Sequence, residues 1–236
     1  MRELLKNHKG NLTDRWSSYT QVYENFLASK KEATTAILEV GVQNGGSLEI
    51  WAKYFPSADR IVGLDINDKI RSVQFQDARI EALVLDATKD EAKSILVQKF
   101  GSKSFDLIID DGSHITSHQQ QTLGYLFNNY LTSGGIYVCE DIHTSLWNNY
   151  VDTNQTTLDL FEKFNVDKVF KCNLLTNEQN AYLTQHIQSI LIYKRTVNAY
   201  KCYKCKQVNT NNNSTCKCGT ALDPRQNPSY TSIIYK

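Results

Sequence analysis

The chain has 236 residues, of which 41% are hydrophobic and 22% charged, so it can fill the core of one α/β domain with a small appendage. Its formal net charge of +1 excludes a strong overall attraction to nucleic acid or to anionic membranes. The first ten residues lack an apolar signal region, and no apolar run approaches the roughly 20 residues of a membrane-spanning helix. We therefore expect a cytoplasmic protein with no membrane partner.

Strand and helix patterns alternate along the first two thirds of the chain. The spacing of Tyr19, Tyr23, Phe26 and Leu27 predicts a helix within 11–30. Further helices are predicted at 45–55 and 117–131, and apolar runs predict strands at 34–42, 59–67, 81–87, 105–111 and 134–142. These strands are apolar throughout, which is typical of a parallel sheet covered on both faces.

Two late strands are expected at 166–172 and 187–195. Four cysteines then follow within the last 35 residues, and this change in composition indicates a boundary near residue 197. We therefore predict a main domain at 1–196 and a cysteine-containing tail at 197–236. Cys139 and Cys172 stand alone in apolar stretches, as small buried thiols do.

The first predicted strand leads into a glycine-containing turn. A dinucleotide fold would favour G-x-G-x-x-G, but Gln43 stands at the second glycine position, and Glu39 adds a carboxylate before the turn. Because a carboxylate disfavours pyrophosphate, the turn fits a cationic ligand better. We predict that the turn and the following helix contact this ligand through Glu39, Gly41, Gly45 and Ser47.

Two further acidic residues end the next two strands. Asp65 stands where a side chain accepts ribose hydroxyls, and Asp86 stands where a base edge can be bound. Together with Glu39 they fit S-adenosylmethionine, which joins an adenosine to a sulfonium and an amino-acid group. Asp110, at the end of the fourth strand, is counted with this cofactor site. The alternative is that these acids only cap helices.

Acidic residues also end the fourth and fifth strands, which are expected neighbours about 4.8 Å apart. Asp111 follows one strand, and Glu140 and Asp141 follow the other. Three carboxylates would repel one another without a cation, and oxygen ligands suit Mg²⁺ first, then Mn²⁺ or Ca²⁺. The sequence thus predicts a magnesium site formed by Asp111, Glu140 and Asp141.

A histidine accompanies this predicted metal site. His114 has the proton affinity of a general base, and an alcohol needs both a metal and a base to become a nucleophile. We therefore assign catalysis to His114 and Asp111. The alternative is that His114 and His118, four residues apart, chelate zinc or iron on one helix face.

The segments "ILEVGVQNGGSLEIWAKYFPSADRIVGLDIND", "FDLIIDDGSHITSHQQ" and "GGIYVCEDIHTSLW" resemble class I S-adenosylmethionine-dependent methyltransferases. The likeness covers roughly 13–195 and is strongest to metal-dependent sugar O-methyltransferases of the mycinamicin type. It implies a Rossmann-like, doubly wound, seven-stranded and mostly parallel sheet, often in a homo-oligomer. In that family the residues matching Asp111, His114, Glu140 and Asp141 bind Mg²⁺ and supply the base.

The resemblance does not extend to the cysteine tail, which contains C-x₂-C, ten residues and then C-x-C. Four thiolates in two close pairs fit a structural Zn²⁺ site of the ribbon or knuckle kind, and a segment this short needs such a metal to fold. The predicted zinc ligands are Cys202, Cys205, Cys216 and Cys218. Disulfides are the alternative, but a reducing compartment disfavours them.

The chain is therefore expected to be an O-methyltransferase acting on a sugar hydroxyl in a surface glycan or a small-molecule glycoside. A nucleic-acid methyltransferase guided by the zinc tail is the second hypothesis. We do not expect it, because Asp110, Asp111, Gly112 and Ser113 occupy the place of an N-P-P-Y-like motif. A scaffold without catalytic activity is the third hypothesis, and the acids at each strand end argue against it.

Overall fold

The computed structural model describes residues 1–13, 17–195, 199–201, 204–205, 207–210, 216, 218–220 and 229–236. Its main feature is a seven-stranded sheet with the strand order β3-β2-β1-β4-β5-β9-β6. The strands are β1 (Ala36–Val40), β2 (Arg60–Asp65), β3 (Ile80–Val84), β4 (Phe105–Asp110), β5 (Leu131–Cys139), β6 (Ser189–Arg195) and β9 (Ser229–Tyr235). The first five run parallel, and β9 runs antiparallel to both of its neighbours. The predicted mostly parallel, seven-stranded sheet is confirmed.

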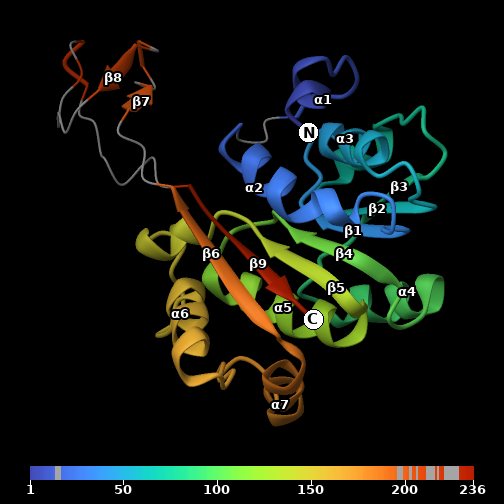
Figure 1. Ribbon diagram of the computed structural model, residues 1–236, viewed down its shortest axis with the longest axis vertical. Helices are drawn as coiled ribbons and strands as arrows, with labels where there is room; N and C mark the ends of the chain where they lie inside the picture. Colours follow the sequence, from blue (N-terminus) through green and yellow to red (C-terminus); the bar gives the residue numbers. More distant parts are fainter. Residues whose placement is uncertain are drawn as a thin grey trace.

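Helices cover both faces of this sheet. One face carries α1 (Arg2–Lys6), α2 (Ser17–Leu27) and α3 (Gly46–Tyr54), and the other carries α4 (Asp90–Phe100), α5 (Thr116–Asn129), α6 (Thr157–Asp167) and α7 (Asn177–His186). Figure 1 shows these two layers above and below the strands. Short 3₁₀ helices are η1 (Ala28–Lys30), η2 (Asp68–Ser72) and η3 (Ile142–Leu146).

Alternate residues of the strands enter two separate cores. In β4, Ile108 packs with the α4–α7 layer, whereas Leu107 and Ile109 pack with the α1–α3 layer. Because a strand turns successive side chains to opposite faces, a strand buried on both sides must be apolar at every position. This explains why the strands show unbroken apolar runs in the sequence.

The last third of the chain differs from the expectation in two ways. Residues 166–172 form the end of α6 and a coil instead of a strand. In addition, β9 inserts between β5 and β6, so residues 229–235 belong to the sheet and not to a tail beginning at 197. Ile233 and Ile234 enter the two cores from opposite faces of β9, and this burial anchors the strand in the main domain.

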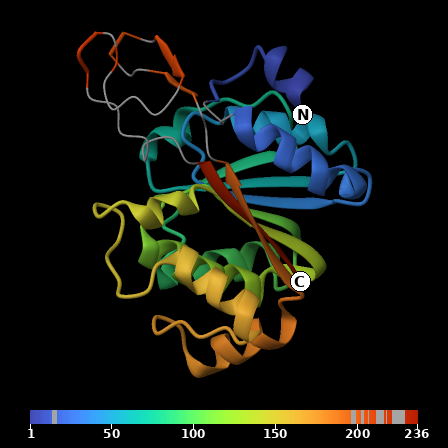
Figure 2. The same ribbon diagram turned by 60° about the vertical axis from the view of Figure 1, so that its left-hand side comes forward.

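The cysteine segment is therefore an insertion between two strands of the sheet. Its described residues include a two-stranded antiparallel ribbon of β7 (Ala199–Lys201) and β8 (Val208–Thr210). This ribbon lies apart from the main sheet, beyond the last residue of β6 and the first residue of β9 (Figures 1 and 2). Among the described residues, no helix is long and apolar enough to cross a bilayer.

Candidate active site

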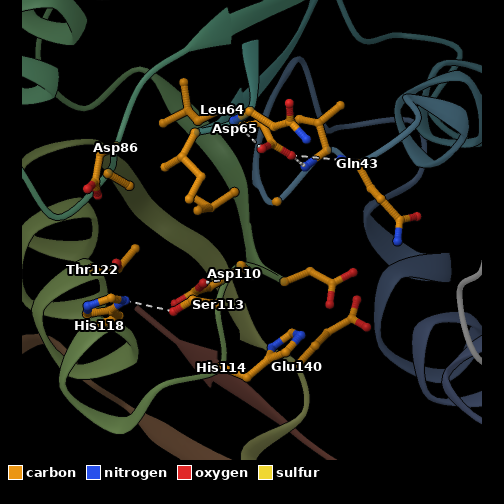
Figure 3. Close-up of a pocket in the computed structure, with 18 of the residues that line it drawn as sticks. Gln43, Leu64, Asp65, Asp86, Asp110, Ser113, His114, His118, Thr122 and Glu140 are labelled. Atoms are coloured by element: carbon orange, nitrogen blue, oxygen red, sulfur yellow. Dashed lines mark hydrogen bonds between the residues drawn. The ribbon is translucent and has the colours of Figure 1, made fainter. Parts of the chain in front are cut away.

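A cavity of about 420 Å³ opens at the carboxyl ends of the parallel strands. It lies where the strand order reverses between β1 and β4, the position at which doubly wound sheets bind ligands. Its lining combines the expected cofactor loop with the expected metal loops, including Gly41, Ser47, Asp65, Asp86, Asp110, Asp111, His114, Glu140 and Asp141. Figure 3 shows Asp65 and Asp86 on one side and His114 and Glu140 on the other.

Two of the predicted cofactor residues, Glu39 and Gly45, are not among the described residues that line the cavity. Glu39 is completely buried in β1, and its carboxylate accepts a 2.7 Å hydrogen bond from the hydroxyl of Ser47, which does line the cavity. Gly45 precedes α3 with a φ of 86°, and a Cβ there would meet the ring of Phe75. Both residues therefore support the turn without lining the cavity.

Asp65 is held by the backbone of the glycine turn. One carboxylate oxygen accepts hydrogen bonds from the amides of Val42 and Gln43, at 2.9 and 2.8 Å, and the other accepts one from the amide of Asn67. Figure 3 shows Asp65 directed toward the turn that carries Gln43. Because a carboxylate oxygen accepts more than one hydrogen bond, this arrangement fixes the side chain and leaves capacity for ribose hydroxyls.

Asp86 is fixed within its own turn. One of its carboxylate oxygens accepts hydrogen bonds from the hydroxyl and the amide of Thr88, at 2.6 and 2.9 Å. Burial opposes ionisation of Asp86, but these hydrogen bonds, together with the positive charge of Lys89, lower the pKa on balance. The residue therefore presents a charged acceptor to the cavity.

Gly41 lies where the glycine turn after β1 contacts the loop after β4, which carries Asp111. Its φ is 88°, and a Cβ at this position would lie 2.1 Å from the carbonyl oxygen of Asp111. The amide of Asp111 also donates a 2.9 Å hydrogen bond to the carbonyl oxygen of Val40. The two loops are therefore in direct backbone contact, which only a glycine at position 41 permits.

The metal loops bring Asp111, His114 and Asp141 together. Their donor atoms lie within 4.8 Å of one another, and Nε2 of His114 is 3.6 Å from Oδ2 of Asp141. His114 and Asp141 both have left-handed backbones, with φ of 59° and 53°. Strained conformations of this kind cost about 1–3 kcal/mol each and tend to occur at functional sites.

Glu140 is not part of that three-residue cluster. It lines the cavity, but it is only 2% exposed, and its carboxylate accepts a hydrogen bond from the hydroxyl of Tyr23 in α2. Asp141 likewise accepts a hydrogen bond from the hydroxyl of Tyr19, one helical turn earlier. In the sequence these two tyrosines predicted only a helix, through their spacing. Their phenol groups lie four residues apart on one helix face, a spacing that tyrosines of a helix core share, so the sequence held no separate signal for this role.

The alternative pairing of His114 with His118 does not form. Because α5 begins at Thr116, His114 precedes the helix, and the two histidines do not share a helix face. Nδ1 of His118 instead lies 2.8 Å from the hydroxyl of Ser113, as Figure 3 shows. His118 lines the cavity but is outside the donor cluster found among the described residues.

Asp110 lies beneath the metal loops and is 4% exposed. Burial raises its pKa to about 7, although the amide of Gly112 and the hydroxyl of Tyr137 donate hydrogen bonds to its carboxylate at 3.4 and 3.2 Å. Asp110 therefore exchanges a proton near neutral pH, unlike Asp86.

A second donor cluster lies outside this cavity. Among the described residues, the sulfur atoms of Cys205, Cys216 and Cys218 lie within 4.8 Å of one another. Hydrogen bonds from Thr220 lower the pKa of Cys218 to about 6. Cys202, the fourth predicted ligand, lies outside the described residues.

The chain also resembles known proteins. The family model for FtsJ-like methyltransferases matches residues 20–194. The 8-demethyl-8-alpha-L-rhamnosyl tetracenomycin-C 2'-O-methyltransferase of Streptomyces olivaceus is 32% identical over 164 residues, which are 64% of this chain and 42% of that protein. The mycinamicin VI 2''-O-methyltransferase of Micromonospora griseorubida is 33% identical over 136 residues, 55% of this chain and 32% of that protein.

The solved structures include a similar enzyme with bound ligands. The MycE methyltransferase from the mycinamycin biosynthetic pathway, in complex with Mg, SAH and mycinamycin VI, aligns with a TM-score of 0.61 and 28% identity. The alignment covers 77% of this chain and 48% of that one. The chain therefore spans about half or less of the length of the relatives it matches.

Proposed function

We propose that this chain, which belongs to the FtsJ-like methyltransferase family, transfers a methyl group from S-adenosylmethionine to a hydroxyl group of a sugar, aided by a divalent metal ion. The observation that carries the proposal is that one cavity holds both the acids suited to the cofactor and the Asp111, His114 and Asp141 cluster. The relatives that are named as sugar O-methyltransferases support the choice of acceptor.

The cavity suits the cofactor chemically. Asp65 and Asp86 present fixed carboxylates for ribose and base, and Gly41 lines the same cavity. The carboxylates of Asp111 and Asp141, whose donor atoms lie within 4.8 Å of each other and of the His114 imidazole, fit a divalent cation such as Mg²⁺ or Mn²⁺, while the imidazole serves proton transfer. Glu140 remains a predicted ligand, adjacent in sequence to Asp141.

The bound groups would supply an activated methyl group and a cation that lowers the pKa of the acceptor hydroxyl. The protein would supply the base, because His114 lines the cavity and its imidazole would take up the proton of that hydroxyl. Asp141, 3.6 Å from Nε2, stabilises the imidazolium that results. The left-handed backbones of His114 and Asp141 hold both groups before the substrate arrives.

The test is methyl transfer from labelled S-adenosylmethionine to a panel of sugar-bearing small molecules and glycans, with Mg²⁺ or with EDTA. We expect labelled glycoside, a requirement for the metal, and no transfer to RNA or DNA under the same conditions. Labelled nucleic acid would favour the alternative methyltransferase. Absence of cofactor binding in isothermal titration would favour a scaffold.

A further inference from the structure

The cysteine insertion leaves and re-enters the sheet at one point. Arg195, at the end of β6, pairs directly with Ser229, at the start of β9. Since β9 is antiparallel to β5, and Ser232 lies opposite Cys139, this point is at the same edge of the sheet as the carboxyl ends of the parallel strands. The insertion therefore begins and ends beside the candidate active site.

The sulfur positions in the insertion suit a tetrahedral metal ion. Sγ of Cys205 lies 3.5 Å from Sγ of Cys216, which is far longer than the roughly 2.05 Å of a disulfide bond. A Zn–S bond of about 2.3 Å in a tetrahedral site places two sulfurs about 3.8 Å apart. The three described sulfurs, all within 4.8 Å, match that arrangement.

The insertion also needs a stabilising cross-link. Neither hydrophobic core includes a described residue of 199–220, and each strand of the β7–β8 ribbon has only three residues. A two-stranded ribbon is marginally stable by itself, and short segments without a core commonly rely on a metal. Cys216 is 2% exposed, so the sulfur cluster takes the central position that apolar side chains would otherwise fill.

The strand that follows the insertion contacts the loop carrying the metal-site acids. The amide of Tyr230 donates a 3.4 Å hydrogen bond to Nδ1 of His143, and the hydroxyl of Thr231 donates one to the carbonyl oxygen of Cys139 at 3.1 Å. The carbonyl oxygen of Tyr230 accepts from Tyr19, whose hydroxyl also bonds to Asp141. The start of β9 thus supports residues on both sides of Glu140 and Asp141.

We propose that Cys205, Cys216 and Cys218 bind one structural Zn²⁺, and that this ion fastens the start of β9 against the loop of residues 139–143. Cys202 is assigned as the fourth thiolate from the C-x₂-C spacing alone. The ion cross-links Cys205 to Cys216 and Cys218 within the segment that connects β6 to β9, and this cross-link limits the freedom of Tyr230 and Thr231. The proposal does not depend on which group the active site transfers.

The first experiment measures metal binding by the full chain. We expect one zinc per chain by elemental analysis after dialysis against Mg²⁺. Replacement of that zinc by Co²⁺ should give the thiolate-to-cobalt charge-transfer band and the visible bands of a tetrahedral site. A wild-type protein without stoichiometric zinc, or with cobalt bands that lack the thiolate transition, would overturn the proposal.

Variants then locate the site. Cys205→Ser and Cys202→Ser should each weaken the thiolate band or reduce zinc affinity by at least tenfold, whereas Cys172→Ser, at a buried cysteine elsewhere, should retain the wild-type band and affinity. Wild-type zinc affinity and band intensity in Cys205→Ser would rule out the site, and the same result in Cys202→Ser would rule out the fourth ligand. If a variant fails to fold, the cobalt spectrum of the wild-type protein still tests the proposal.

The second experiment tests the connection to the active-site loop. Hydrogen exchange of the wild-type protein with zinc is compared with exchange after its removal by a thiolate-competing chelator, with Mg²⁺ present throughout. Amides in 229–235 and 139–143 should exchange at least tenfold faster without zinc, while those of β2 and β3 at the opposite edge stay unchanged. Equal exchange in 229–235 with and without zinc would refute the fastening role.

Discussion

The two sides of the cavity hold their acidic residues in different ways. On the cofactor side, Asp86 bonds to Thr88, two residues away, and Asp65 bonds to Asn67 and to the glycine turn of the preceding strand, 22 and 23 positions away. On the metal side, Asp141 and Glu140 bond to Tyr19 and Tyr23, which are more than a hundred positions away in the sequence. The cofactor side is therefore held by contacts within consecutive strand–helix units, whereas the metal side also depends on the packing of α2, a helix distant in the sequence, on the sheet.

The largest expected effect lies on the metal side. His114→Asn should lower kcat by about 10²–10⁴-fold, because the base is lost, while cofactor affinity stays within about twofold. Asparagine tolerates the left-handed backbone at this position, so strain does not explain the loss. Steady-state kinetics and titration with S-adenosylhomocysteine measure the two effects. An active variant would remove His114 from its role as base.

Gly41→Ala should disturb both sides together. The new Cβ would clash with the carbonyl of Asp111, and a side chain at this φ costs about 1–2 kcal/mol in addition. We expect at least a tenfold loss of cofactor affinity and weaker binding of divalent metal, measured by calorimetry. Gly134→Ala is the matched control, with a φ of 74° and no atom within 4 Å of its Cβ. Similar losses in both variants would contradict contact between the loops as the cause.

The pH dependence of stability should have opposite signs for Asp110 and Asp86. Asp110 has a pKa of about 7 in the folded protein and 3.8 in the unfolded chain, so the folded state binds more protons between these values. Its contribution to stability therefore falls as pH rises from about 4 to 7. At about 1.4 kcal/mol per pKa unit, the fall amounts to a few kcal/mol.

Asp110→Asn should remove this decrease in stability between about pH 4 and 7. Urea unfolding with EDTA at several pH values measures it.

The pKa of Asp86 is lowered, so its contribution to stability is present above about pH 4 and disappears as pH falls through the folded pKa. Asp86→Asn should therefore lose stability near neutral pH relative to the wild type. If Asp110→Asn follows the wild-type curve throughout, burial does not raise the pKa of Asp110.

The smallest effect is expected from Tyr23→Phe. Removing the hydroxyl leaves the buried carboxylate of Glu140 without that donor, at a cost of about 1–3 kcal/mol in unfolding free energy. Divalent metal binding should weaken several-fold, measured by titration with Mn²⁺, because Glu140 adjoins Asp141.

Tyr130→Phe is the control for this variant. Tyr130 is equally buried and its hydroxyl donates to the carbonyl oxygen of Lys93, far from the metal loops. It should lose stability without a change in metal affinity. Equal metal affinity in Tyr23→Phe and the wild type would show that α2 does not position the metal side.

The sequence by itself determined the parallel strands, the acids at their ends and the proximity of Asp111 to Asp141. This was predictable because apolar runs mark doubly buried strands, and the carboxyl ends of parallel strands meet at one edge. A residue at the end of a parallel strand can therefore be recognised from the local sequence, and its position at that edge of the sheet follows.

Only the tertiary structure decided which residues support the metal side and which strands residues 229–235 pair with. A tyrosine that fills a core and one that also donates to a distant carboxylate have the same helical spacing, so Tyr19 and Tyr23 carried no separate signal. Residues 229–235 follow a polar, cysteine-containing segment, which hid their return between β5 and β6. Pairing partners of this kind are chosen by burial against other strands, and that choice is made only when the whole sheet assembles.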